Sequence, residues 1–184
     1  MKLEKDNIFH IYNQGNNRRR IFFEKAHYNL FISKIKDYIV PYTDVLAWCL
    51  MPNHFHILVY TKEEKITLNS VTKERTINSS IGIMLRSYTT TINRKMGWSG
   101  SLFREETKAK IIDINQTINT NFYDAAQLQE CYNYILLNPV KAGIVNNPAN
   151  WEFSSFKDTL GIIKPRLINI EKIKEFDLIL PNID

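Results

Sequence analysis

The stretch CLMPNHFHILVY, residues 49–60, decides the fold that we expect for this chain. Its second half is rich in β-branched and aromatic residues, which favour a strand, and strand side chains alternate between the two faces of a sheet. His54 and His56 therefore lie side by side on one face. Two neighbouring imidazoles suit one divalent metal ion, but a pair of half-buried structural histidines has the same spacing.

The residues before this stretch predict a second strand beside it. Residues 45–50 are apolar on both faces, so both faces of the sheet must be covered. The link over residues 51–53 is short, which favours an antiparallel pair.

Two amphipathic helices and two further strands complete the predicted core. Apolar residues recur at three- and four-residue spacing over residues 24–39 and again over about 80–96, where residues 78–80 offer N-caps and a glycine-rich segment follows. Residues 8–13 and 108–114 have strand character. Residues 61–80 are expected to form a loop, with room for a small hairpin.

The order strand, helix, strand, strand, helix, strand predicts an α+β fold with a ferredoxin-like split βαβ core. This core is a four-stranded antiparallel sheet with two helices on one face. A last helix over about 124–138 is then expected to cover the other face, which carries the histidines. We expect a catalytic domain over residues 1–150 and a C-terminal extension over residues 151–184.

One face of the last helix carries polar residues at four-residue steps: Glu130, Tyr134 and Asn138. A tyrosine that faces two histidines could attack a phosphodiester while a metal withdraws charge from the phosphate. Asn138 could add an oxygen ligand, and Glu130 a further ligand or a proton acceptor. The alternatives are that Tyr134 only packs and that Asn138 caps the turn at Pro139.

Composition narrows the class of protein. The chain has 184 residues, 44% hydrophobic residues and a net charge of +5, which fits a globular protein with a mild preference for polyanions such as nucleic acid. Cys49 and Cys131 are too few for a disulfide framework, and we interpret them as buried thiols in a reducing cytoplasm. No apolar run has membrane-spanning length, so no membrane partner is expected.

Three consecutive arginines, Arg18 to Arg20, follow the turn residues after the first predicted strand. They could clamp phosphate groups or form an ordinary solvated loop, and their position alone does not decide between these roles.

Four ordered blocks resemble a known family, the IS200-like Y1 transposases of the HUH endonuclease superfamily. The likeness is strongest to their REP-associated tyrosine transposase branch and extends over about residues 9–157. The blocks are NQGNNRR (13–19), WCLMPNHFH (48–56), GWSGSLFR (97–104) and YILLNPVKAG (134–143).

The resemblance implies a metal-dependent endonuclease and strand transferase that acts on single-stranded or hairpin DNA. It implies a 5′-phosphotyrosine intermediate on Tyr134, and a site for Mg²⁺ or Mn²⁺ made by His54, His56 and Asn138. It makes the segment from Arg104 to Lys110 an expected part of the DNA surface. The predicted DNA contacts are Arg18, Arg19, Arg104, Lys108 and Lys110.

One residue departs from the family pattern. Gln14 stands where the family motif has a basic residue, which leaves the details of DNA recognition open. A catalytically silent DNA-binding protein derived from such a transposase is an alternative function, and a ferredoxin-like domain with structural histidines is another. The chain is expected to act as a monomer or a homodimer.

Overall fold

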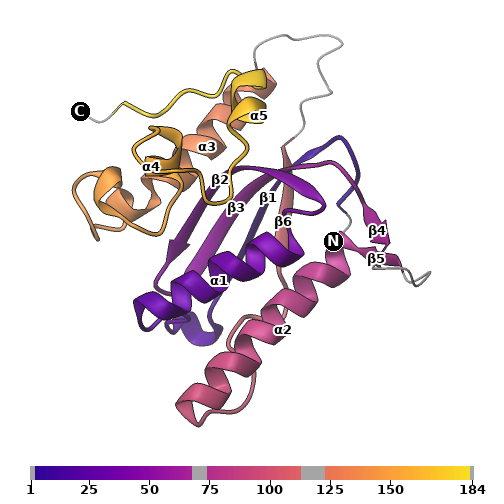
Figure 1. Cartoon of the computed structure of the whole chain (residues 1–184). Coiled ribbons are helices and arrows are strands. Elements are labelled where there is room, and N and C mark those ends of the chain that lie inside the picture. The colour runs from indigo at the N-terminus through magenta and orange to yellow at the C-terminus, as the bar shows by residue number, and fades with distance from the viewer. Residues whose placement is uncertain (1–2, 68–73, 113–122, 183–184) are drawn as a thin grey trace.

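The computed structural model describes residues 3–67, 74–112 and 123–182. Its centre is a four-stranded sheet in the order β2-β3-β1-β6, with every neighbouring pair antiparallel (Figure 1). This confirms the predicted α+β fold with a ferredoxin-like core. The strands are β1 (Ile8–Gln14), β2 (Thr43–Met51), β3 (His54–Thr61) and β6 (Lys108–Ile112).

The strand register decides which side chains meet on each face. Tyr12 of β1 lies opposite His56 of β3, and Cys49 of β2 lies opposite His56 from the other side. Because side chains alternate along each strand, His10 and His54 share the face of His56.

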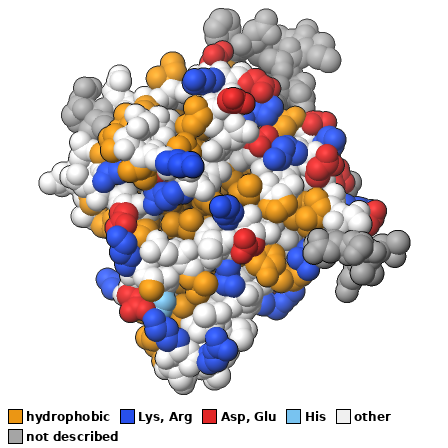
Figure 2. Space-filling model, in the orientation of Figure 1, with side chains coloured by type: hydrophobic (Ala, Val, Ile, Leu, Met, Phe, Trp, Pro, Cys, Tyr) orange, Lys and Arg blue, Asp and Glu red, His pale blue; other side chains and the backbone are white. Residues whose placement is uncertain are grey.

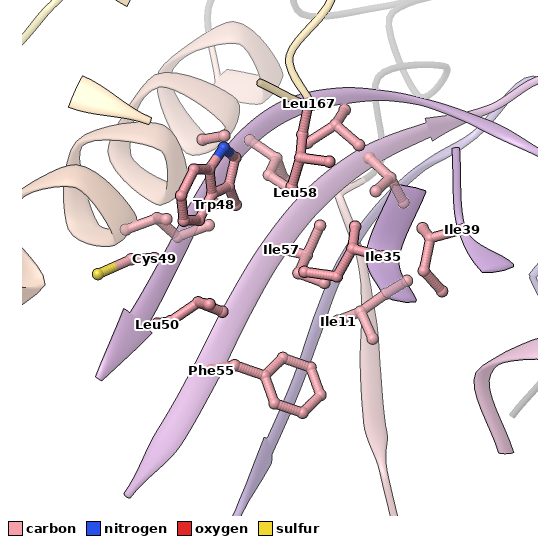
Figure 3. Packing of buried hydrophobic residues seen from close by; sticks show 14 of the residues in the cluster. Ile11, Ile35, Ile39, Trp48, Cys49, Leu50, Phe55, Ile57, Leu58 and Leu167 are labelled. Carbon is pink, nitrogen blue, oxygen red and sulfur yellow. The ribbon is translucent and has the colours of Figure 1, made fainter. Parts of the chain in front are cut away.

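Helices α1 (Lys25–Tyr38) and α2 (Ile77–Met96) lie together on the other face (Figure 1). Figure 3 shows Ile11 and Ile57 of the sheet beside Ile35 of α1, all three at most 1% exposed. Farther along this face the ring centroids of Phe31 and Phe55 are 5.1 Å apart. This dry layer of aliphatic and aromatic side chains is the main core of the protein.

Helix α2 begins earlier than its sequence pattern indicates. The expected start near Ser80 is wrong, because the side chain of Thr76 accepts a hydrogen bond from the amide of Ser79 and caps a helix that starts at Ile77. The helix ends at Gly97, whose φ of 68° is in the left-handed region.

Helix α3 (Tyr123–Lys141) covers the opposite face of the sheet, as predicted (Figure 1). It continues past Asn138 and includes Pro139, so the alternative that Asn138 caps a separate turn is wrong. The missing amide of Pro139 costs one helical hydrogen bond, but the amide of Ala142 still donates to the carbonyl of Asn138 and the last turn closes.

The segments outside this core are short. Strands β4 (Lys65–Thr67) and β5 (Glu74–Thr76) form the small hairpin for which the sequence left room. The predicted strand over 108–114 is present to Ile112, and the rest of it lies outside the described residues. Two single-turn 3₁₀ helices, η1 (Asn16–Arg18) and η2 (Pro148–Asn150), lie after β1 and after α3.

The last part of the chain runs along the outer edge of β2. It contains helices α4 (Phe156–Thr159) and α5 (Ile170–Glu175). The amide of Leu50 donates to the carbonyl of Phe153, and the amide of Asn169 donates to the carbonyl of Val45. The sequence pattern had given this segment no regular structure.

Neither the surface charge nor the cysteines point to a particular function. On the face that α1 and α2 form, basic and acidic side chains are interspersed (Figure 2). Cys49 is buried as expected, but Cys131 is only partly buried; both are free thiols. Within the described ranges, we find no helix with the length and apolar character needed to span a bilayer.

Candidate active site

The candidate site lies between α3 and the sheet, where His54 and His56 of β3 face Tyr134 of α3. The ring centroids of His56 and Tyr134 are 5.4 Å apart, and those of the two histidines are 5.0 Å apart. Tyr134 is 40% exposed, so its phenol is accessible to a large substrate. The structure thus brings together a tyrosine and two imidazoles that are far apart in the sequence.

Asn138 joins this group from the next turn of α3. Its Oδ1 lies 3.3 Å from Nε2 of His54. Asn138 is 7% exposed, one helical turn beyond Tyr134, and therefore on the same side of the helix. The amide oxygen of Asn138 therefore lies where it could bind the same ligand as the imidazoles.

The neighbours of His54 show which of its nitrogens carries the proton. The Nδ2 of Asn53 donates to the carbonyl of Arg18 at 3.1 Å, so the Oδ1 of Asn53 faces His54. Nδ1 of His54 lies 2.6 Å from that oxygen and must donate to it. Nε2 of His54 then carries a lone pair, and it faces the oxygen of Asn138.

His56 has one engaged nitrogen and one free nitrogen. Its Nδ1 lies 2.8 Å from Nε2 of His10. Its Nε2 is buried and has no hydrogen-bond partner within the described residues. A buried polar atom without a partner is costly, and an ion or a water molecule bound at the site is one explanation for such an atom.

Burial keeps all three imidazoles neutral near pH 7. It lowers the pKa of His56 to about 2, with smaller contributions from the neighbouring His10 and His54. Burial, helped by the charge of Lys110, lowers the pKa of His10 to about 4. Burial also lowers the pKa of His54, and the Oδ1 of Asn138, which would accept a hydrogen bond from a protonated Nε2 of His54, opposes this shift. Neutral imidazole is the form that binds metal ions.

These observations fit a divalent cation. The lone pair of His54 Nε2 meets the oxygen of Asn138 with no proton between them, and Nε2 of His56 is an unpartnered atom close by. Two imidazole nitrogens and one amide oxygen are a mixed donor set compatible with Mn²⁺ or Mg²⁺. In the described ranges no cluster of three or more His, Cys, Asp or Glu side chains is arranged to hold a metal ion, so the amide of Asn138 is essential to this set.

A cavity of about 220 Å³ opens beside the histidines and Tyr134. Arg104 and Lys108, two of the predicted DNA contacts, line it. Glu106 also lines it and forms an ion pair with Lys108, which reduces the positive charge there.

The other predicted residues lie around this cavity rather than in it. Lys110 and Glu130 line a second hollow on the other side of Tyr134. Arg19 lines a third hollow beside Trp98, and Arg18 is exposed, with its carbonyl bonded to Asn53. Glu130 is thus near Tyr134 but is not grouped with the two histidines.

Three residues at the candidate site were not predicted from the sequence. His10 and Tyr12 of β1 pack against His56, with ring centroids 5.0 and 5.8 Å from it, and their alternation along the strand was a signal that they share a face. The ammonium group of Lys141 lies 5.4 Å from the centre of the Tyr134 ring. Its spacing from Tyr134, two helical turns, was also visible in the sequence.

Loop geometry holds the first resembling block against the site. A Cβ on Gly15 would lie 2.2 Å from the carbonyl oxygen of Arg19, so no other residue fits there without a shift of the backbone. The amide of Gly15 donates to the carbonyl of Asn53, next to His54.

A comparison with solved structures supports the assignment of the fold. A solved structure of a REP-associated tyrosine transposase bound to a REP hairpin matches with a TM-score of 0.60 and 18% identity, over 92% of this chain and 87% of that one. The chain has the fold of a Y1 transposase. This confirms the fold that the four sequence blocks of the Y1 transposase family implied.

Other comparisons add nothing to this assignment. A bacterial tRNA(His) guanylyltransferase-like protein in complex with GTP matches with a TM-score of 0.39 and 10% identity, over 80% of this chain and 72% of that one. A TM-score at that level supports no conclusion about this chain. No protein-family model matches the sequence, and no curated protein matches it.

Proposed function

We propose that the protein is a metal-dependent endonuclease and strand transferase for single-stranded DNA. The observation that carries the proposal is the position of Tyr134 against His56, beside the Nε2 lone pair of His54 and the oxygen of Asn138. A phenol and two neutral imidazoles line one cavity, and the amide oxygen of Asn138 lies against one of these imidazoles. They are the groups that nucleophilic attack on a metal-bound phosphate requires.

His54, His56 and Asn138 would hold Mg²⁺ or Mn²⁺. When bound, such an ion acts as a Lewis acid and withdraws charge from the scissile phosphate. Burial of the two imidazoles fixes their rings and keeps them unprotonated, so they offer the same nitrogens at any pH near neutrality.

Tyr134 supplies the nucleophile. Its phenol oxygen forms a bond to phosphorus and loses its proton, while the bond from phosphorus to the 3′-oxygen breaks and that oxygen takes up a proton. The product is a 5′-phosphotyrosine that keeps the energy of the broken bond. Attack by another 3′-hydroxyl reverses the step and joins the strands, and Glu130 is a proposed accessory acceptor for the proton.

One chain holds every proposed catalytic group. The 5.4 Å between the rings of His56 and Tyr134 is a distance within a single protomer, so we propose that the tyrosine acts at the metal site of its own chain. A monomer is then sufficient for cleavage.

Basic residues would hold the DNA backbone near the tyrosine. Arg104 and Lys108 line the cavity of the histidines, and Lys110 lies in the adjoining hollow. Arg18 and Arg19 lie on a separate exposed loop, where they could hold a flanking duplex. The structural neighbour is bound to a hairpin, which makes a hairpin-associated DNA end our proposed substrate.

The test is a cleavage assay on labelled single-stranded oligonucleotides from the DNA that flanks the gene, with Mn²⁺ or Mg²⁺. The wild-type protein should form a covalent adduct that survives denaturation, and Tyr134→Phe should reduce its formation by about 10⁴-fold or more, as loss of a nucleophile does. Tyr132→Phe makes the same change two residues away on the buried side of α3 and should leave the adduct intact.

Two outcomes would contradict the proposal. An undiminished adduct in Tyr134→Phe would remove the tyrosine from its assigned role. Salt-sensitive DNA binding with no nicked product under any divalent metal would favour the catalytically silent DNA-binding protein instead.

A further inference from the structure

His10 of β1 is a buried histidine in direct contact with the proposed metal site. It is 8% exposed, and its Nε2 lies 2.8 Å from Nδ1 of His56. We propose that His10 is a positioning residue that accepts the Nδ1 proton of His56 and so directs the Nε2 lone pair of His56 toward the metal. This inference rests on the proposed function.

The proton between His10 and His56 can be placed in two ways. Two neutral imidazole nitrogens at 2.8 Å must share one proton, because each ring nitrogen is either a donor or an acceptor. If His10 donates, Nε2 of His56 must carry a proton that is buried and has no acceptor in the described part of the chain, and this nitrogen cannot bind a metal. If His56 donates, its Nε2 carries the lone pair that a ligand needs.

The other histidine of the site shows the same pattern. Nδ1 of His54 donates to the oxygen of Asn53, and its Nε2 is left as a lone pair that faces Asn138. His10 and Asn53 thus occupy equivalent positions behind the two proposed ligands. Histidine ligands of metals usually donate their other ring proton to a fixed acceptor, which sets both the tautomer and the ring orientation.

The packing around His10 supports a positioning role rather than direct ligation. Its Nε2 is engaged by His56, and its ring packs on Tyr12 with centroids 4.8 Å apart. Strand β1 pairs with β3, so the backbone of the sheet fixes the contact between His10 and His56. Such a rigid acceptor can hold the His56 ring in one orientation before any metal binds.

The test compares two substitutions in the full chain. In His10→Gln, the side-chain oxygen can still accept from Nδ1 of His56, whereas in His10→Leu no acceptor remains. We expect His10→Leu to weaken Mn²⁺ binding, measured by calorimetry, by about 10–100-fold, as loss of such partners does elsewhere. His10→Gln should recover most of the affinity.

A second measurement needs no metal. Long-range ¹⁵N–¹H spectra of the wild-type protein should show His56 protonated on Nδ1 and His10 with an unprotonated Nε2. His10→Leu should shift His56 toward the other tautomer, and His10→Gln should not.

The outcomes separate the two proposals. A wild-type His56 protonated on Nε2, or equal Mn²⁺ affinity in wild type and His10→Leu, would overturn the role of His10. A wild-type protein with the expected tautomers that neither binds Mn²⁺ nor cleaves DNA would overturn the proposed function and leave the hydrogen bond from His56 to His10 established.

Discussion

The two faces of the sheet are built from the same strands but differ in chemistry. Under α1 and α2 the strands present Ile11, Phe55 and Ile57, all fully or almost fully buried against apolar side chains (Figure 3). Under α3 the intervening residues present His10 and His56, whose polar atoms are buried as well. The first face is held mainly by apolar packing, whereas on the second the Nε2 of His56 is buried without a hydrogen-bond partner among the described residues.

The proposed metal site thus lies on the face that contributes less to folding stability. A buried aromatic layer stabilises a domain by removing apolar surface from water. A buried imidazole with a free nitrogen contributes less, because its desolvation is not offset by a hydrogen bond. Mutations on the two faces should therefore have different effects, on folding for one and on ligand binding for the other.

The largest effect on folding is expected for Phe31→Ala on the α1 face. Phe31 is fully buried and contacts Phe55 and Tyr88, with ring centroids 5.1 and 5.0 Å away. Loss of the ring leaves a cavity and should lower the free energy of unfolding by about 3–5 kcal/mol. Urea denaturation followed by tryptophan fluorescence measures it, and a loss below about 1 kcal/mol would show that this layer is not the core.

On the opposite face, His56→Ala should mainly affect metal binding. Removal of this proposed ligand should lower the affinity for Mn²⁺ by about 100-fold or more, which exceeds the effect expected for loss of the hydrogen bond to His10. Its loss of unfolding free energy should be smaller than that of Phe31→Ala, because loss of the hydrogen bond to His10 costs about 1–3 kcal/mol and Nε2 of His56 has no partner among the described residues. Calorimetry and urea denaturation of both variants make the comparison, and equal losses of stability would contradict the contrast between the faces.

The smallest effect is expected at the rim of the site. Arg104→Gln removes one positive charge from the cavity of the histidines and should lower the slope of log affinity against log salt by about one. Fluorescence anisotropy with a labelled single-stranded oligonucleotide measures the slope. Lys36→Gln, an exposed change on α1, is the matched control and should leave the slope unchanged; a similar change in both variants would mean that the DNA does not follow this cavity.

The fold and the centre of the site could be predicted because both follow from local periodicity. Alternation along residues 54–60 placed His54 and His56 on one face, and four-residue spacing placed Tyr134 and Asn138 on one side of a helix. The order of elements then put that helix over that face.

What the sequence could not supply depends on contacts between distant segments. His10 is a lone histidine in an apolar strand until the register places it beside His56. Asn53 supports His54 only because the carbonyl of Arg18 holds its amide group. Such long-range contacts leave no periodic signal in a single sequence.

The segment after Asn150 has a consequence for the behaviour of the protein in solution. It occupies the outer backbone groups of β2 at Val45, Trp48 and Leu50, which would otherwise form an open sheet edge. Open edges recruit strands from other molecules, and the opposite edge, β6, carries exposed lysines that oppose such pairing. A chain shortened to residue 150 would expose an apolar, unpaired β2 and should self-associate through it, so the segment protects the sheet against aggregation.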